Sequence, residues 1–353
     1  MTTIDEAKLN EFVGKFLGDL GAAVHAATVV VGDQAGLYHT LAETGPATAA
    51  QVAAAAGYDE RYVLEWLNAQ AASGYCAYGD GRYWLTPEQA FCLADQTSPG
   101  YLAAGMLVAN AVHQDVTRSI DAVRSGAGIG WGDHHEHLYA GTERFFRPGY
   151  QANLVSSWIP ALAGVADKLH RGGWVADVGC GHGASAIVLA QAFPQARIVG
   201  LDPHPGSIEA ARKAAVEAGV SERVQFEVGT AQDFPVSGAG YDLVCVFDAL
   251  HDMGDPVGAA AHIRSALATD GTWLLVEPAA GETVEENLNP VGRIFYSAST
   301  LLCTQSARSQ SGGYALGAQA STEQLRAVCV EGGFTSVRLV ARTPVNRVFE
   351  VRV

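Results

Sequence analysis

The stretch WVADVGCGHG, residues 174–183, decides the fold of this 353-residue chain. Its apolar first half predicts a short buried strand, and a helical pattern over 184–192 follows the glycines. Glycines let the backbone turn sharply and let a ligand approach closely, because no Cβ stands in the way. Similar turns open dinucleotide-binding domains, but here Asp177 stands inside the strand and the spacing is DxGxGxG rather than GxGxxG. The stretch therefore predicts a strand–turn–helix unit that starts a ligand-binding α/β domain.

β-prone apolar runs alternate with alanine-rich amphipathic helices in the rest of this half. That alternation predicts a parallel sheet covered on both faces. Because parallel strands end at the same edge of a sheet, the residues that follow each strand should meet there. The expected strands are 174–178, 197–201, 224–228, 241–247 and 272–276, and a final antiparallel hairpin is expected near 334–340 and 346–353.

Asp202 ends the second of these strands, about 20 residues beyond the glycine turn. A carboxylate at that position can accept two hydrogen bonds from the hydroxyls of a ribose. The same side chain could cap the helix that begins at Pro205, and the two roles are compatible. We predict that Asp202 contacts a ribose.

Four motifs occur in order: DVGCGHG (177–183), LDP (201–203), VGTAQDFP (228–235) and YDLVCVFDALHD (241–252). As an ordered set they resemble the consecutive motifs of class I methyltransferases, although any one of them alone is a weak signal. The resemblance covers about 174–353. It implies a Rossmann-like sheet of seven strands, S-adenosylmethionine as the cofactor and methyl transfer as the reaction.

The resemblance also implies a role for each matching position. Asp177 and the backbone of Gly179 and Gly181 hold the methionyl end of the cofactor, and Asp202 takes the ribose. Thr230 departs from the family pattern, in which an acid is common, so the neighbouring backbone is expected to contact the adenine. The cofactor-binding positions carried over are Asp177, Gly179, Gly181, Asp202, Pro203, Gly229, Thr230, Ala231, Phe247 and Asp248, with Asp233 as a further candidate beside the adenine.

His251 and Asp252 follow the fourth strand and resemble the His-Asp pair of plant O-methyltransferases, in which the histidine is the general base. An imidazole with an ordinary pKa near 6.5 suits removal of a hydroxyl proton at neutral pH. Alternatively, His251 only packs near the helix start at Asp255-Pro256, or has a cofactor-side role. We take His251 as the predicted catalytic residue and leave these alternatives open.

The first 95 residues predict helices that end in a small hairpin. The runs 75–78 and 82–85 flank an Asp-Gly turn, which is typical of a hairpin. Helices are expected over about 5–20, 21–42, 48–56 and 59–73. This order is a winged-helix pattern and resembles the N-terminal domain of small-molecule O-methyltransferases, which implies a homodimer formed through this domain.

The charge of the chain argues against nucleic acid as a partner. The formal net charge is −15, and residues 1–95 carry four basic residues against about a dozen acidic ones. The helix that would enter a DNA groove holds Asp59, Glu60 and Glu65 beside a single Arg61, so phosphates would repel it. No uncharged apolar run reaches about 18–20 residues, so a membrane span is not expected either.

Six cysteines form no CxxC pair and do not stand with histidines at the spacing of a structural zinc site. We expect reduced, mostly buried thiols in a cytoplasmic protein without a bound metal. The clustered histidines His134, His135 and His137 are expected in a solvated loop or at a pocket edge. Arg144, Arg147 and Tyr150 are candidate contacts to the methionyl carboxylate or to a substrate.

The sequence therefore predicts three parts: a winged-helix and dimerisation domain over 1–95, a helical linker and pocket wall over 96–172, and a cofactor-binding domain over 173–353. A lid insertion is expected at about 279–316, with a flexible stretch from Ser306 to Gly313. The predicted function is methyl transfer to a small, largely apolar or aromatic acceptor, on a hydroxyl oxygen. The alternatives are N- or C-methylation by the same fold, a cofactor-sensing winged-helix regulator and a nicotinamide dehydrogenase.

Overall fold

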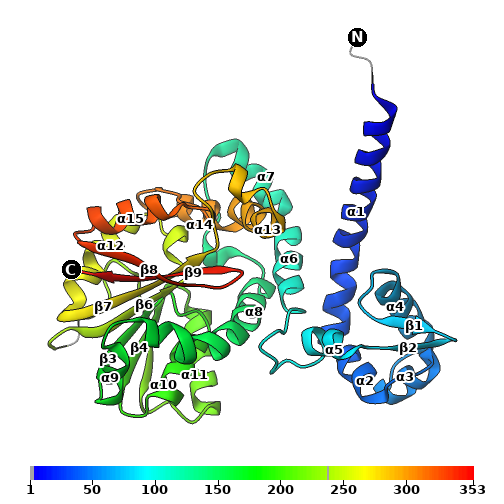
Figure 1. Cartoon of the computed structure of the whole chain (residues 1–353), viewed down its shortest axis with the longest axis horizontal. Helices are drawn as coiled ribbons and strands as arrows, with labels where there is room; N and C mark the ends of the chain where they lie inside the picture. The colour runs from blue at the N-terminus through cyan, green and yellow to red at the C-terminus, as the bar shows by residue number, and fades with distance from the viewer. Residues whose placement is uncertain (1–3, 237) are drawn as a thin grey trace. The chain divides into compact units, whose positions relative to one another are not determined.

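The computed structural model describes residues 4–236 and 238–353, which fall into two compact units (Figure 1). The first unit runs to His113 and includes Ala140–Pro148, and the second contains Gln114–Tyr139 and Gly149–Val353. The region 96–172, expected to be a linker and pocket wall, is therefore shared between the two units. Helix α8 (His137–Asn153) contributes residues to both of them.

The first helix of the N-terminal unit is longer than predicted. Helix α1 (Glu6–Gln34) begins where the Asp5 side chain accepts hydrogen bonds from the backbone N–H groups of Ala7 and Lys8. The predicted division into helices over 5–20 and 21–42 was wrong, because the backbone stays helical through Gly21. The chain turns instead at Gly36, whose φ of 68° lies in the left-handed region that favours glycine.

The remaining elements of this unit follow the predicted winged-helix order. Thr48 and Gln51 form the predicted capping box of α3, and the Asp59 side chain accepts from the N–H groups of Arg61 and Tyr62 at the start of α4. The elements are α2 (Leu37–Thr44), α3 (Ala49–Ala56), α4 (Glu60–Ala72), β1 (Ala77–Gly79), β2 (Arg82–Trp84), α5 (Pro87–Leu93) and α6 (Gly105–Gln114).

The second unit is built on a sheet of seven strands in the order β5-β4-β3-β6-β7-β9-β8 (Figure 1). The pairs from β5 to β7 are parallel, whereas β9 is antiparallel to both of its neighbours. The predicted seven-stranded sheet with its antiparallel final hairpin is confirmed, although β7 is longer than expected. The strands are β3 (Trp174–Val178), β4 (Arg197–Asp202), β5 (Val224–Val228), β6 (Tyr241–Phe247), β7 (Leu267–Pro278), β8 (Ser336–Arg342) and β9 (Asn346–Arg352).

Helices cover both faces of this sheet, and the central strands β3, β4 and β6 are accordingly almost entirely buried. Because successive side chains alternate across a strand, Val175 and Leu243 face one core while Ala176 and Val244 face the other. The first core is closed by α9 (Val165–His170), α10 (Ala184–Ala192) and α11 (Pro205–Glu217), and the second by α12 (Pro256–Ala266) and α15 (Thr322–Glu331).

The insertion over 279–316 is mostly helical. The predicted flexible stretch from Ser306 was wrong at its start, because Ser306 is buried and its carbonyl accepts hydrogen bonds from the side chains of Ser309 and Gln310. The insertion contains the turn η5 (Glu285–Asn287), α13 (Pro290–Ala298), the π-helical turn η6 (Ser299–Cys303) and α14 (Thr304–Ser309). Its action as a lid remains a prediction.

Helix α1 has the length and composition of a membrane-spanning helix, although only 22% of the apolar window is buried within the protein. The sequence criterion, an uncharged run, excluded a span, whereas a window that tolerates two charges admits this helix. Core helices of other proteins and signal sequences near an N-terminus meet the same criterion, so this is weak evidence for a membrane.

Candidate functional site

The glycine turn after β3 is held tightly against its neighbours. Gly179 has a φ of 78°, and a Cβ at this position would lie 2.9 Å from the Cβ of Ala249. The backbone N–H groups of Gly179 and Cys180 donate to the carbonyl oxygen of Leu201 at 2.8 and 2.9 Å. Gly181 also has positive φ, and the space beside its Cα is open. The turn therefore joins the ends of β3, β4 and β6 and leaves an open cradle at Gly181.

Asp177 is fully buried at the end of β3. Its Oδ2 accepts a hydrogen bond from the Ser185 hydroxyl at 2.5 Å, whereas its Oδ1 has no hydrogen-bond partner among the described residues. Burial, followed by the charge of Asp202, raises the pKa of the Asp177 carboxyl to about 7. A buried acceptor without a partner fits a donor supplied by a ligand, such as the ammonium of a methionyl group.

The raised pKa of Asp177 predicts a pH-dependent penalty on folding. The folded state binds a proton that the unfolded state releases above its ordinary pKa of 3.8, so stability falls as pH rises from about 4 to about 7. We expect Asp177→Asn to raise the free energy of unfolding by at least about 2 kcal/mol at pH 8 and by little at pH 4. Urea unfolding at both pH values measures this difference. Asp121→Asn, at an exposed carboxylate on helix α7 (Val116–Ser125), is the control, and an equal effect at both pH values would contradict the prediction.

Asp202 lies at the end of β4, beside the glycine turn. Its Oδ2 accepts from the N–H of Gly181 at 3.0 Å, and its Oδ1 accepts from the N–H of His204 at 2.9 Å. Each carboxylate oxygen accepts up to two hydrogen bonds, so both retain capacity for the hydroxyls of a ribose. The alternative role as a helix cap falls to another residue, because the His204 side chain accepts from the N–H of Ser207 at the start of α11.

In the loop after β5, the polar side chains form hydrogen bonds with one another. Asp233 Oδ1 accepts from the backbone N–H and the hydroxyl of Thr230, at 3.1 and 2.6 Å. Ala231 is buried, and the N–H of Gly229 donates to the carbonyl of Asp202 at 3.2 Å. The side chains of Thr230 and Asp233 are thus engaged with one another. This favours the expectation that the backbone of this loop contacts an adenine.

The end of β6 places an aromatic cluster beside a strained aspartate. The Phe247 ring lies 5.2 Å from the Tyr150 ring and 6.2 Å from the Trp158 ring, measured between centroids. Asp248 has a φ of 49°, and both of its carboxylate oxygens accept from the Asn346 side chain, at 2.8 and 2.9 Å. Burial, followed by the charge of Glu277, raises the pKa of the Asp248 carboxyl to about 8. Strained φ values in non-glycine residues are concentrated at functional sites.

His251 lies in the short turn η4 (Leu250–Asp252) and is held by an acid that sequence reasoning missed. Its Nδ1 lies 2.6 Å from Glu277 Oε2, and its Nε2 lies 3.2 Å from Asp252 Oδ1. Glu277 Oε1 accepts from the N–H of Leu250, which fixes the same carboxylate to the turn. Burial alone would lower the pKa of His251, but the carboxylates of Glu277 and Asp252 outweigh it and raise the pKa well above its ordinary value. The position of Glu277 at a strand end on the reactive edge was the available signal.

Two further candidate side chains have partners that the sequence did not indicate. The Arg144 guanidinium donates to both oxygens of Asp33, at 2.7 and 2.8 Å, and to the Tyr101 hydroxyl at 2.9 Å, and its contact to the methionyl carboxylate or a substrate stays a prediction. These three residues form a buried ion-pair network within the N-terminal unit. His134 is not solvated, since it is buried with its Nδ1 2.8 Å from Asp115 Oδ2.

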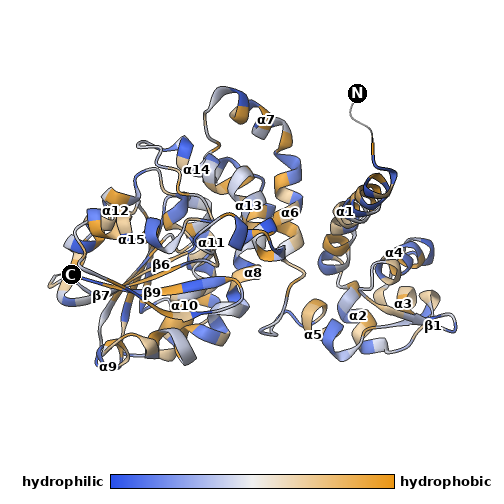
Figure 2. Ribbon diagram, turned by 45° about the horizontal axis from the view of Figure 1, so that its top comes forward, coloured by the Kyte–Doolittle hydropathy of each residue, from blue (hydrophilic) through white to orange (hydrophobic). Residues whose placement is uncertain are grey.

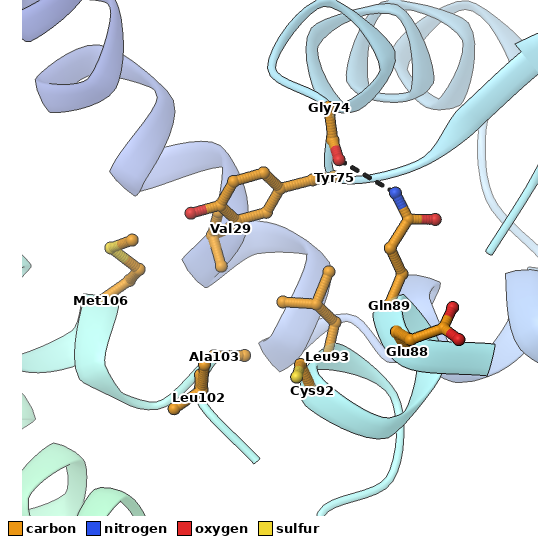
Figure 3. A pocket seen from close by; sticks show the side chains of 10 residues that line it. All are labelled: Val29, Gly74, Tyr75, Glu88, Gln89, Cys92, Leu93, Leu102, Ala103 and Met106. Atoms are coloured by element: carbon orange, nitrogen blue, oxygen red, sulfur yellow. Dashed lines mark hydrogen bonds between the residues drawn. The ribbon is translucent and has the colours of Figure 1, made fainter. Parts of the chain in front are cut away.

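A separate hollow of about 290 Å³ lies within the N-terminal unit (Figure 3). It is mostly apolar, and Gln89 donates to the carbonyl of Gly74 at its edge, at 2.9 Å. Its volume is at the lower limit of pockets that bind small molecules. Its lining residues are Val29, Gly74, Tyr75, Glu88, Gln89, Cys92, Leu93, Leu102, Ala103 and Met106.

The parallel sheet, the glycine cradle and the acids at successive strand ends define a class I methyltransferase fold with its cofactor edge. Comparison with known proteins agrees: residues 169–324 match the model of a methyltransferase domain, and residues 23–95 match that of an Rv2258c-like winged helix-turn-helix domain. Residues 169–324 are therefore a methyltransferase domain, and residues 23–95 are a winged helix-turn-helix domain.

Two solved structures have the same fold along nearly their whole length. A putative O-methyltransferase from Nostoc punctiforme is 18% identical, with a TM-score of 0.70 over 99% of both chains. A mitomycin 7-O-methyltransferase is 20% identical, with a TM-score of 0.68 over 99% of this chain and all of that one. Among curated relatives, 27-O-demethylrifamycin SV methyltransferase from Amycolatopsis mediterranei is 31% identical over 46% of this chain. That match spans 60% of the relative's own length.

Proposed function

We propose that this chain transfers a methyl group from S-adenosylmethionine to the hydroxyl oxygen of a small, largely apolar or aromatic acceptor. The observation that carries the proposal is the clamped imidazole of His251 at the cofactor edge of the sheet. Its Nδ1 is fixed by Glu277, and Ala249 in the preceding loop packs against the glycine turn at Gly179. A fixed base beside a cofactor cradle is what oxygen methylation requires.

The residues present fit the cofactor. Asp177 offers a buried acceptor without a partner, Gly181 leaves open space, and Asp202 retains acceptor capacity on both oxygens. We infer that Asp177 and the backbone of Gly179 and Gly181 hold the methionyl end, and that Asp202 and Pro203 contact the ribose. The loop from Gly229 to Ala231 contacts the adenine, while Phe247 and Asp248 form the floor near the sulfonium.

The bound cofactor supplies a methyl group that is already activated by its sulfonium. The chain therefore has to orient the acceptor and remove its proton, and orientation alone can supply roughly 7–11 kcal/mol of barrier reduction. Glu277 accepts from Nδ1–H of His251 and fixes the ring, while Nε2 faces Asp252 Oδ1 at 3.2 Å, so the ring acts as a base in the form that has lost its Nε2 proton. That nitrogen takes the hydroxyl proton as the acceptor oxygen attacks. Because the pKa of His251 is raised well above its ordinary value, this deprotonated form is populated only at correspondingly higher pH, where it is the stronger base.

The presence of a general base also indicates which atom of the acceptor is methylated. A hydroxyl must lose its proton at or before attack, whereas a neutral amine attacks with its lone pair and needs no such base in the first step. The His251–Glu277 pair therefore favours oxygen over nitrogen as the acceptor atom. Nitrogen or carbon methylation is the competing function, and dimethylglycine N-methyltransferase from Parasynechococcus marenigrum, 27% identical over 45% of this chain, is a relative of that kind.

We infer that the winged-helix unit serves assembly rather than DNA binding. Helix α4 begins with Asp59 and Glu60, and its Arg61 is paired with Glu65, so its surface offers little to a phosphate backbone. The six free thiols, five of them buried, favour a reducing compartment, and we propose the cytoplasm.

We propose that α1 forms a homodimer interface. Along α1, one apolar stripe is at least 45% exposed, and Figure 2 shows hydrophobic segments along this helix. The stripe consists of Leu9, Phe12, Val13, Phe16, Leu17, Leu20 and Val24. A stripe of this size requires an apolar partner, and the same stripe of a second copy is self-complementary.

Introducing charge into this stripe is expected to separate the protomers. Phe12→Lys with Phe16→Lys places two like charges in each half of the interface, so the dimer should give way to monomer in sedimentation velocity at micromolar concentration. Lys8→Ala with Lys15→Ala, on the same helix, is the control and should remain dimeric. A wild-type chain that is monomeric in solution and sediments with neutral vesicles would instead favour a membrane as the partner of α1.

The function is tested by calorimetric titration of the full chain with S-adenosylhomocysteine, followed by transfer of a labelled methyl group to a panel of phenolic acceptors. We expect micromolar binding and a product one methyl group heavier by mass. Binding without transfer to any phenol, but with transfer to amines, would move the assignment to nitrogen. No binding of S-adenosylhomocysteine would contradict the proposal.

A further inference from the structure

Two side chains of the turn that carries the proposed base lie beside Cys303 of the π-helical turn η6. Ligand atoms of His251, Asp252 and Cys303 all lie within 4.8 Å of one another. Nε2 of His251 and Oδ1 of Asp252 are 3.2 Å apart. In a tetrahedral zinc site, bond lengths near 2.1 Å place a nitrogen and an oxygen ligand about 3.4 Å apart. The His251–Asp252 pair therefore lies close to the spacing that Zn²⁺ imposes, and the ligand atom of Cys303 lies within 4.8 Å of both.

Hydrogen bonding around this cluster has the arrangement that supports a metal. Metal-bound histidines usually donate their other ring N–H to a carboxylate, and Nδ1 of His251 lies 2.6 Å from Glu277. Oδ1 of Asp252 is buried and makes no hydrogen bond of acceptable geometry within the described part of the chain. Glu277 thus already holds the ring of His251, and Asp252 Oδ1 faces His251 Nε2 at 3.2 Å.

A second buried imidazole lies near the cluster. Nδ1 of His134 is engaged by Asp115, but its Nε2 has no hydrogen-bond partner in the residues that the structure describes. The loop that leads to His134 packs against α14, since a Cβ at Gly128 would meet the carbonyl of Gln305. Helix α14 continues directly from the π-helical turn that ends with Cys303. An unpartnered ring nitrogen therefore stands on the loop that borders this cluster.

The donor set selects the ion. Imidazole nitrogen, carboxylate oxygen and thiolate sulfur together suit Zn²⁺, whereas Mg²⁺ and Ca²⁺ prefer oxygen ligands only. His251 and Cys303 are almost fully buried, and the side chain of Asp252 is 18% exposed although its Oδ1 is buried. Three protein ligands leave a fourth position for solvent.

We propose that His251, Asp252 and Cys303 bind Zn²⁺, and that the bound ion blocks the action of His251 as a base. Coordination occupies the lone pair on Nε2, which then cannot accept the proton of a hydroxyl. Metal binding itself does not depend on the proposed methyl transfer; only its inhibitory effect rests on that function. The site is therefore an inhibitory one, sensitive to the free zinc concentration.

Zinc binding is tested on the tag-free full chain after treatment with EDTA, by competition with a chromophoric chelator. We expect one Zn²⁺ per chain and, with Co²⁺ as a substitute, a thiolate-to-metal charge-transfer band in the near ultraviolet. Cys303→Ala should weaken Zn²⁺ binding at least tenfold and remove that band. Cys329→Ala, at an equally buried thiol in α15, is the matched control and should leave both unchanged. Wild-type affinity in Cys303→Ala, or no stoichiometric binding, would overturn the proposal.

Inhibition is tested separately on methyl transfer. Zn²⁺ at concentrations that fill the site should suppress wild-type turnover, EDTA should restore it, and Cys303→Ala should need at least tenfold more Zn²⁺ for the same inhibition. Turnover that is unaffected at full zinc occupancy would overturn the inhibitory role. If the chain neither binds S-adenosylhomocysteine nor methylates any acceptor, the proposed function fails, while the chelator competition still decides the metal site.

Discussion

His251→Gln is expected to lower kcat for methyl transfer by about 10²–10⁴-fold, the range that a positioned general base contributes. The amide of glutamine can still donate to Glu277, so the buried carboxylate keeps a partner and the turn keeps its shape. It cannot accept a proton near neutral pH. Single-turnover rates with a phenolic acceptor, measured at saturating cofactor, give the change directly.

Two measurements separate loss of the base from general damage. The Kd for S-adenosylhomocysteine should stay within a few-fold of the wild-type value, because no contact to the cofactor is removed. His262→Gln is the matched control: its Nε2 lies 2.8 Å from the carbonyl oxygen of Phe234, away from the reactive turn, and kcat should be unchanged. A variant at His251 that keeps wild-type kcat would show that the imidazole has a packing or cofactor-side role.

Asp202→Asn is expected to weaken S-adenosylhomocysteine binding by roughly 10²-fold or more, since a hydrogen bond to a charged group contributes about 1.5–3 kcal/mol and two ribose hydroxyls are involved. Asparagine fills the same volume and can still accept from Gly181 or His204 through its carbonyl oxygen. Titration calorimetry of wild type and variant gives the two dissociation constants. Glu227→Gln, exposed on the neighbouring strand, is the control for loss of charge.

A ligand variant distinguishes ribose contact from support of the glycine turn. For the wild-type protein, removing the 2′-hydroxyl of S-adenosylhomocysteine should weaken binding by much of the factor that Asp202→Asn costs. For the Asp202→Asn variant, the same change in the ligand should weaken binding little, because the partner of that hydroxyl is already lost. If removal of the 2′-hydroxyl raises the Kd by the same factor for both proteins, Asp202 acts only by supporting the backbone of Gly181 and His204.

The cofactor half of the molecule could be predicted closely from sequence because its signals are local. Residues 174–183 contain a buried apolar run and a glycine turn, and both properties belong to consecutive residues. The strands β3 to β7 follow the predicted order, and their parallel pairing brings Asp177, Asp202 and His251 to one edge of the sheet. The start of helix α3 at Thr48 could also be predicted, because its capping box is formed by four consecutive residues.

The sequence did not indicate a contact where a residue's partner is distant along the chain. Arg144 was a candidate contact to the methionyl carboxylate or a substrate, and the structure pairs it with Asp33, 111 positions away. His134 was expected in solvent, yet Asp115 and the packing around it bury it. Spacing along the chain likewise could not reveal that Cys303 lies beside His251 and Asp252, and the expectation of no bound metal stays a prediction.

Periodicity and turn chemistry are properties of neighbouring residues, so they were enough to predict a parallel α/β sheet in the C-terminal half, with a glycine turn and acids at successive strand ends. The partners of those acids could be seen only after the chain was folded. The tertiary structure placed Glu277 on Nδ1 of His251, Asn346 on Asp248 and Cys303 beside Asp252. The physical reason is that hydrogen bonding and burial set the protonation and partners of a buried group, and both depend on segments brought together by folding.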